Sequence, residues 1–257
     1  MRPRIAIPLP HSERPDYNER TWPQYARAVE ACGGEAVAIP LDGTPEEIAR
    51  QAAECHAVLL PGSPADVDPQ KYSQPRHPHT SAADPKRDNV DELLLQDAYH
   101  LHKPVLGICY GLQSLNVWRS GTLVQHIESE VNHEAGKHVP IAHAVKLEPQ
   151  SRLAAILEGA GVKGAELPVN SSHHQSPETV GDGLKAVARS QDGVIEALEG
   201  SNPAHFVLGV QWHPERGFEQ DRASRAIFES FTREAAAYAR QEEKDKPSVI
   251  RDDPKSS

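Results

Sequence analysis

The chain has 257 residues, of which 38% are hydrophobic and 25% are charged, enough for one large α/β domain or two small ones at about 150 residues per domain. No apolar run approaches the roughly 20 residues of a membrane-spanning helix, and Pro8 and Pro10 interrupt the only apolar stretch that resembles a signal peptide. The net charge of −10, from 27 basic and 37 acidic residues, disfavours binding to nucleic acid. We therefore expect a cytoplasmic protein that binds neither membranes nor nucleic acid.

The cysteines and histidines predict no metal centre. Cys32, Cys55 and Cys109 are an odd number without C-x-x-C spacing, so they form neither a disulfide framework nor a zinc ribbon. The 14 histidines include neighbouring pairs such as His173 and His174. None of these pairs has the His-Glu-x-x-His spacing or a cysteine partner at zinc-ligand distance. We expect surface or active-site histidines, no metal and no cofactor.

The first half of the chain alternates short apolar runs with amphipathic segments. Thr44 is predicted as an N-cap with Pro45 at the first helical position, and Asp88 as the cap of the following helix. Strands separated by helices favour a parallel sheet with helices on both faces. The predicted strands are 4–9, 36–39, 57–60 and 105–108, and the predicted helices are 22–31, 44–55, 88–101 and 112–119.

The second half predicts antiparallel hairpins. Short apolar runs are separated by turn signals such as Asp192-Gly193. The expected strands are 142–147, 184–189, 194–198 and 206–211, and a closing amphipathic helix spans 223–238. The fold class is therefore α/β, with one three-layer domain over 1–240 and a mostly parallel sheet that has antiparallel additions. Residues 241–257 are charged or polar and predict a disordered tail.

The segment Gly107-Ile108-Cys109-Tyr110-Gly111 lies where a strand is expected to end and a helix to begin. Glycines two residues before and after Cys109 permit a sharp turn that exposes a strained nucleophile at the carboxyl end of a sheet. A helix start favours the thiolate, and the N–H of Tyr110 would face a developing oxyanion. Cys109 is a candidate nucleophile; the alternative is a core cysteine beside two packing glycines.

His213 and Glu215 follow the last predicted strand, in Gln211-Trp212-His213-Pro214-Glu215. A cysteine nucleophile needs a base to accept its proton and an acid to fix the tautomer of that base. His213 and Glu215 supply both groups from one junction. The alternative, a polar turn after a strand, leaves Cys109 unexplained. We therefore predict a triad of Cys109, His213 and Glu215.

These segments resemble class I glutamine amidotransferases, and more closely the γ-glutamyl hydrolase branch, peptidase C26, which includes γ-glutamyl-γ-aminobutyrate hydrolase of putrescine breakdown. The resemblance covers nearly the whole chain. It rests on the two segments above and on Leu60-Pro61-Gly62-Ser63-Pro64, Asp66-Val67-Asp68-Pro69 with Tyr72, Arg87-Asp88, Gln113, Leu115-Asn116-Val117, Gly121-Thr122-Leu123, Val169-Asn170-Ser171-Ser172-His173-His174-Gln175 and Asp192-Gly193-Val194-Ile195-Glu196.

The resemblance implies a flavodoxin-like fold and a hydrolase that cleaves a γ-glutamyl amide through a γ-glutamyl thioester, releasing glutamate and an amine. It implies an oxyanion hole formed by the main chain of Gly62 and Tyr110. For the pair His173 and His174 the alternative is a structural loop held by imidazole hydrogen bonds. The substrate contacts that it implies are Gln113, Asn170, Ser171, His173, His174 and Gln175.

The chain departs from the family pattern at two places. Trp118-Arg119-Ser120 stands where relatives commonly have a small residue and paired glycines, and Tyr110 stands where many have Arg. We expect Tyr110 and the loop 61–86 to form the rim on the side of the leaving amine. The sequence leaves open the identity of that amine, the pathway and whether the chain forms a homodimer.

Three functions compete: a stand-alone γ-glutamyl hydrolase, a glutaminase subunit that delivers ammonia to a partner synthetase, and an inactive binding scaffold. The complete triad disfavours the scaffold. The segments around Gly62 and Asn170 resemble the stand-alone branch. We therefore expect hydrolysis of a small γ-glutamyl compound such as γ-glutamyl-γ-aminobutyrate.

Overall fold

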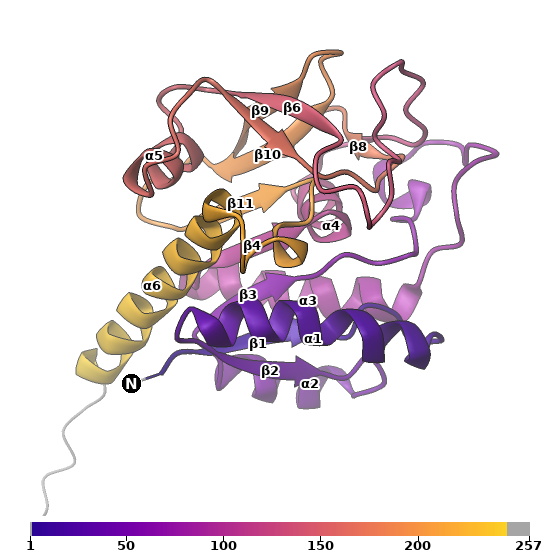
Figure 1. Cartoon of the computed structure of the whole chain (residues 1–257). Helices are drawn as coiled ribbons and strands as arrows, with labels where there is room; N and C mark the ends of the chain where they lie inside the picture. The colour runs from indigo at the N-terminus through magenta and orange to yellow at the C-terminus, as the bar shows by residue number, and fades with distance from the viewer. Residues whose placement is uncertain (1, 246–257) are drawn as a thin grey trace, which may run out of the picture.

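The computed structural model describes residues 2–245, and its centre is a nine-stranded mixed sheet (Figure 1). The strand order is β2-β1-β3-β4-β11-β10-β9-β6-β7. The strands are β1 (Arg4–Pro8), β2 (Glu35–Ile39), β3 (Ala57–Leu60), β4 (Val105–Ile108), β6 (His143–Leu147), β7 (Glu166–Val169), β9 (Leu184–Ser190), β10 (Ile195–Gly200) and β11 (Val207–Val210), while β5 (Leu123–Val124) and β8 (Ser176–Pro177) pair separately.

The sheet changes direction at β11. Strands from β2 through β4 to β11 are parallel, whereas β11, β10, β9, β6 and β7 pair antiparallel. The expected mixed sheet is confirmed, and the turn at Asp192-Gly193 joins β9 to β10 with Gly193 at a φ of 87°. The parallel half places the ends of β3, β4 and β11 side by side at one edge.

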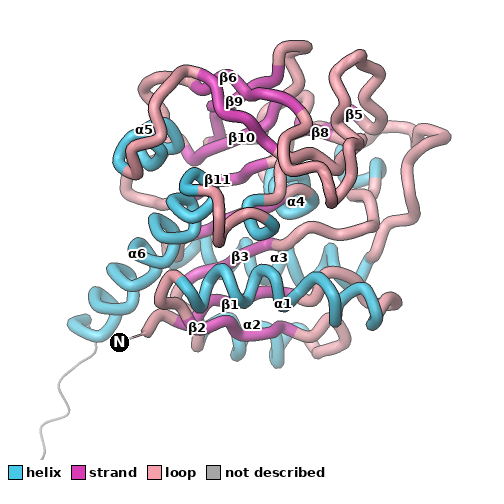
Figure 2. The backbone as a smooth tube through the Cα atoms, viewed as in Figure 1, coloured by secondary structure: helices cyan, strands magenta, loops and turns pink. Residues whose placement is uncertain are grey.

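Helices cover both faces of the sheet, as expected (Figures 1 and 2). Helices α1 and α6 pack on one face, and α2, α3 and α4 pack on the other. Their bounds are α1 (Pro15–Ala31), α2 (Pro45–Ala53), α3 (Pro85–Leu101), α4 (Tyr110–Trp118), α5 (Arg152–Gly159) and α6 (Arg222–Asp245), with short 3-10 helices η1 (Pro69–Tyr72) and η2 (Pro214–Arg216). None of the helices within the described range is long and apolar enough to cross a membrane.

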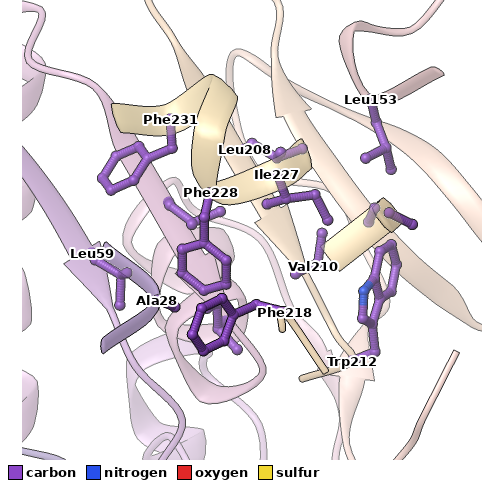
Figure 3. Close-up of a cluster of buried hydrophobic side chains, with 14 of the residues drawn as sticks. Ala28, Leu59, Leu153, Leu208, Val210, Trp212, Phe218, Ile227, Phe228 and Phe231 are labelled. Atoms are coloured by element: carbon purple, nitrogen blue, oxygen red, sulfur yellow. The ribbon is translucent and has the colours of Figure 1, made fainter. Parts of the chain in front are cut away.

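The core beneath α6 is rich in aromatic side chains. Ile227, Phe228 and Phe231 are fully buried and point toward the sheet and α1 (Figure 3). Burying each such side chain contributes about 1.5–3 kcal/mol. This packing fixes α6 across the strands that lead to the predicted triad.

Three helix boundaries differ from the sequence predictions by more than two residues. Helix α1 begins at Pro15 rather than residue 22, because Pro15 preorganises a polar first turn that lacks hydrophobic periodicity. The cap of α3 is Asp84, whose side chain accepts from the N–H of Arg87, and not Asp88. By contrast, Thr44 forms the predicted N-cap of α2, and Glu47 completes a capping box.

The third difference concerns the predicted disordered tail. Helix α6 continues through Asp245, so the prediction is wrong for 241–245. Glutamate and lysine are good helix formers, and Gln241 donates to Asp245 one turn later. The remaining residues of the predicted tail, 246–257, lie outside the described residues.

Candidate active site

Cys109 lies on a sharp turn between β4 and α4. Its φ is 52° and its ψ is −106°, a conformation that costs a non-glycine residue about 1–3 kcal/mol. A Cβ on Gly107 would lie 2.8 Å from the backbone of Gly111, and one on Gly111 would lie 2.1 Å from the carbonyl oxygen of Leu60. Only glycine fits at both positions. This explains the pattern on which Cys109 was predicted as a nucleophile.

His213 and Glu215 follow β11, the parallel neighbour of β4. His213 Nδ1 lies 2.8 Å from Glu215 Oε1, and both residues are buried. The carboxylate accepts, so Nδ1 carries the hydrogen and Nε2 is left as the basic nitrogen. Asn170 fixes the backbone of His213, accepting from its N–H and donating to its carbonyl oxygen, both at 2.9 Å.

Gly62, at the end of β3, lies against both predicted catalytic side chains. A Cβ on Gly62 would lie 3.1 Å from His213 Cε1 and 3.8 Å from Cys109 Cβ. Cys109, His213 and Glu215 also line one cavity of about 780 Å³. The structure thus brings the predicted triad residues together at the carboxyl ends of β3, β4 and β11.

Burial favours the neutral forms of Cys109 and His213. It raises the pKa of the Cys109 thiol to about 12, although Arg216 and the N–H of Tyr110 act in the opposite direction. Burial also lowers the pKa of His213. Burial alone would raise the pKa of Glu215, but the neighbouring His213 holds it below its usual range. A neutral thiol beside a neutral imidazole and a carboxylate can react by transferring the thiol proton as sulfur attacks.

The two predicted oxyanion donors differ in their surroundings. The N–H of Tyr110 hydrogen-bonds to the Cys109 sulfur. The N–H of Gly62 donates to the hydroxyl of Tyr25 at 3.1 Å, so an oxyanion must share or displace that hydroxyl. Arg87 donates to the carbonyl oxygen of Pro61 at 2.7 Å and holds this loop from behind. The oxyanion hole stays a prediction.

The expectation that the Tyr110 side chain forms the cavity rim is wrong. Tyr110 is 1% exposed; its hydroxyl donates to Asp88, and the guanidinium of Arg87 lies 4.9 Å from the centre of its ring. These two contacts hold the ring in the buried interior, away from the cavity mouth. From the loop 61–86, Ser63 and Pro64 do line the cavity.

None of the six predicted substrate contacts lines this cavity. Gln113 donates to the carbonyl oxygen of Gln175, and Ser171 donates to that of His133. His174 contacts Asp66 at 3.1 Å. Asn170 fixes the backbone of His213, and His173 joins a separate histidine cluster described below. Their roles in direct substrate binding stay predictions, which this geometry does not favour.

Sequence reasoning missed most of the residues that do line the cavity. The cavity lining as a whole contains four basic and two acidic residues, although the whole chain carries a charge of −10. The basic residues are Arg20, Arg27, Lys137 and Arg216, and the acidic ones are Glu215 and Glu219. Arg216 is held in place by a 2.8 Å hydrogen bond to Ser172. In the sequence, only Arg216 could have been linked to the site, because it directly follows Glu215. Arg20 and Arg27 lie in a segment that looks like any polar helix face.

Comparison with known proteins agrees with this geometry. The peptidase C26 family model matches residues 7–215. A "Putative glutamine amidotransferase" of Mycobacterium tuberculosis is 36% identical over 227 residues, covering 87% of this chain and 70% of that protein. The γ-glutamyl-γ-aminobutyrate hydrolase of Escherichia coli K12 is 31% identical over 218 residues, covering 81% and 83%.

A solved structure supports the fold alone. A crystal structure described as a "putative gmp synthase subunit a protein" from Thermoplasma acidophilum superimposes with a TM-score of 0.64 at 15% identity, covering 95% of this chain and 98% of that one. The α/β fold expected from the sequence is therefore confirmed. With a family match over most of its length and curated relatives above 30% identity, this chain belongs to the peptidase C26 family of glutamine amidotransferase-like hydrolases.

Proposed function

We propose that the chain hydrolyses the γ-glutamyl amide bond of a small substrate that carries a carboxylate on its amine half, such as γ-glutamyl-γ-aminobutyrate. The observation that carries this proposal is the basic cavity around Cys109. Four basic side chains in an acidic protein, of which Arg20, Arg27 and Lys137 are exposed, favour a substrate with several carboxylates, because local positive charge attracts and orients anions. The likeness to γ-glutamyl-γ-aminobutyrate hydrolases supports the same substrate class.

The triad geometry supports a two-step reaction. In the first step Cys109 Sγ attacks the γ-carbonyl carbon while its proton passes to His213 Nε2. The oxyanion accepts hydrogen bonds from the backbone, and His213 then gives the proton to the amine nitrogen as the C–N bond breaks. Glu215 stabilises the imidazolium formed between these transfers. The products are the free amine and a γ-glutamyl thioester on Cys109.

Water completes the cycle in the second step. His213 takes a proton from the water as its oxygen attacks the thioester carbon. Collapse of the tetrahedral species breaks the C–S bond, and the sulfur regains its proton from His213. Glutamate leaves, and the neutral thiol and imidazole are restored.

Substrate comparison with the purified chain tests this proposal. We expect kcat/KM for γ-glutamyl-γ-aminobutyrate to exceed that for the matched γ-glutamyl butylamide, which lacks the distal carboxylate, by about 10–100-fold, since a charged hydrogen bond contributes about 1.5–3 kcal/mol. Changing each of Arg20, Arg27 and Lys137 to Gln should identify the side chain on which the preference depends. Equal rates on the two substrates would contradict the carboxylate assignment.

Glutamine is the matched substrate for the competing function. Ammonia release from glutamine only in the presence of a partner synthetase, with no cleavage of γ-glutamyl amides by the chain alone, would favour the amidotransferase subunit instead. No cleavage of either class would favour the binding scaffold.

A further inference from the structure

A second polar cluster lies outside the catalytic cavity, in the antiparallel half of the protein. It consists of His133, His143, His173 and Glu196, whose inward-facing side-chain atoms all lie within 4.8 Å of one another. They come from four segments: the loop between β5 and β6, strand β6, the loop between β7 and β8, and strand β10. All four side chains are at least nine-tenths buried. We refer to these four residues as the His–Glu cluster.

Each inward-facing imidazole nitrogen contacts Glu196 at 3.2–3.5 Å, but none of these contacts within residues 2–245 meets hydrogen-bond geometry. The atoms left without a hydrogen bond are His133 Nδ1, His143 Nε2, His173 Nε2 and both carboxylate oxygens of Glu196. A buried polar atom without a partner costs about 1–3 kcal/mol, and more when it is charged. Five such atoms at one point therefore require an explanation.

The outward-facing nitrogens fix the tautomers of the three imidazoles. His133 Nε2 lies 2.9 Å from Asp192 Oδ2. His173 Nδ1 lies 3.0 Å from the carbonyl oxygen of Gln175, and His143 Nδ1 lies 3.4 Å from that of Ala144. These oxygens accept only, so each outward nitrogen carries the hydrogen. In the neutral imidazoles the three inward nitrogens then present lone pairs to the Glu196 carboxylate. A proton on one imidazole would satisfy only part of the group, whereas one metal ion between the four side chains would satisfy all of it.

The three distances from Glu196 match the edges of a tetrahedral metal site. Glu196 Oε1 lies 3.2, 3.3 and 3.5 Å from the inward nitrogens of His133, His143 and His173. Ligands at about 2.0–2.1 Å from a zinc ion are separated by about 3.3–3.4 Å along the edges of a tetrahedron. Hydrogen bonds from the outer nitrogens to a carboxylate and to carbonyl oxygens are the usual surroundings of metal-bound histidines.

We propose that the His–Glu cluster binds one divalent zinc-type ion as a closed structural site. Three imidazoles and one carboxylate suit zinc, and four protein ligands leave no open position for a reacting water. This proposal departs from the expectation of no metal, which weighed only histidines that are neighbours in the sequence.

The site would fix one wall of the catalytic cavity. His173 and Asn170 lie on the same loop, and Asn170 holds the backbone of His213 through its paired hydrogen bonds. The Ser171 hydroxyl donates to the carbonyl oxygen of His133, and the backbone N–H of His173 donates to the same oxygen. A metal that joins His173 to β6 and β10 therefore restrains the loop that positions the catalytic base.

Zinc titration of the full chain, without a histidine tag and after treatment with a strong chelator, tests the proposal. We expect one tightly bound Zn²⁺ per chain and a clear rise in Tm on loading. Co²⁺ in place of Zn²⁺ should give the intense visible absorption of a tetrahedral site. A wild-type chain that binds no stoichiometric Zn²⁺, or whose Co²⁺ complex lacks the tetrahedral absorption, overturns the proposal without any variant.

Variants separate this site from surface histidines. Glu196→Gln and His143→Asn should weaken Zn²⁺ binding by more than about 100-fold, and Asp192→Asn by about 10–100-fold, as expected for an outer hydrogen-bond partner. The control is the double variant His79→Asn with His126→Asn. These two rings stack on each other outside the His–Glu cluster, so their removal should leave tight binding unchanged. Loss of binding in that control, with binding retained in Glu196→Gln and His143→Asn, would place the ion elsewhere and overturn the proposal.

Discussion

The predicted catalytic residues and the His–Glu cluster occupy opposite halves of one sheet and are assembled in different ways. Cys109, His213 and Gly62 follow β4, β11 and β3, three neighbouring parallel strands whose carboxyl ends meet at one edge. The His–Glu cluster instead depends on two strands and two loops that are distant in the sequence. Parallel topology brings catalytic groups together through the backbone, whereas the cluster needs its loops to be held in place.

The two centres also differ in what they do to stability. The sharp turn at Cys109, which we call the elbow, stores backbone strain. The His–Glu cluster instead holds buried polar atoms that make no hydrogen bond. Substitution of Cys109 removes the predicted reacting group and at most relieves this strain, so it should alter kcat more than stability. Changes at the cluster should alter Tm and metal binding more than kcat, and the predictions below test the first half of this contrast.

The largest expected effect is loss of the nucleophile or the base. Cys109→Ser and His213→Ala should each lower kcat/KM by several powers of ten, because members of a catalytic triad act as a unit. The Tm of Cys109→Ser should stay close to that of the wild type. Turnover assays on γ-glutamyl amides, with thermal unfolding as the control, measure both quantities. Near-normal activity in either variant would remove that residue from the triad.

Glu215→Gln should have a smaller effect. The amide retains the shape and one acceptor but loses the charge that stabilises the imidazolium, so we expect a loss of about 10²–10⁴ in kcat with measurable residual turnover. His213→Ala serves as the comparison and should be more severe. Equal kcat values for Glu215→Gln and the wild type would show that the 2.8 Å contact with His213 has no role in the reaction.

The pH dependence follows from the two pKa shifts. Burial lowers the pKa of His213 below the usual value of about 6.5, so the base is neutral at and above about pH 7, and kcat/KM should fall up to tenfold per unit only at lower pH. The thiol pKa of about 12 predicts no rise in rate as the pH is increased from about 7 to about 10. A rate that increases in this range with the ionisation of an ordinary thiol would mean that free thiolate is the reactant.

The smallest effect concerns strain. Cys109→Ala keeps a Cβ at a φ of 52°, whereas Cys109→Gly removes it. Strain of about 1–3 kcal/mol outweighs the entropic cost of glycine, about 0.5–1 kcal/mol. Cys109→Gly should therefore be more stable than Cys109→Ala by about 1 kcal/mol in urea unfolding. The control is Ala155→Gly at an exposed position of α5, where glycine should lower the free energy of unfolding. If glycine also lowers the free energy of unfolding relative to alanine at position 109, the turn at Cys109 is not strained.

The sequence predicted the parallel half well because its signals are local. Gly107 and Gly111 bracket Cys109 within five residues, and the capping box of Thr44 lies within one turn of α2. The alternation of strands with helices determined the order of the layers. The triad also relied on family resemblance, since nothing in the spacing of Cys109 and His213 alone shows that β4 and β11 are neighbours.

The remaining features depend on contacts between distant segments. Helix α5 and strand β7 were missed because each is short, with eight and four residues. The side chain of Tyr110 was misplaced because its position depends on Asp88, 22 residues earlier. The His–Glu cluster joins residues from 133 to 196, and the neighbouring pair His173 and His174 drew attention to the wrong partner. Packing decides such positions, and a single sequence does not display it.

Active-site labelling tests the central claim most directly. An electrophilic glutamine analogue, followed by peptide mapping with mass spectrometry, should place one label per chain on Cys109. Cys32 and Cys55 do not line the cavity that holds His213 and Glu215, so they should stay unlabelled. Excess γ-glutamyl substrate should protect Cys109, and His213→Ala should slow its labelling. A label on another residue, or full turnover by protein whose Cys109 is completely modified, would contradict the assignment of Cys109 as the nucleophile.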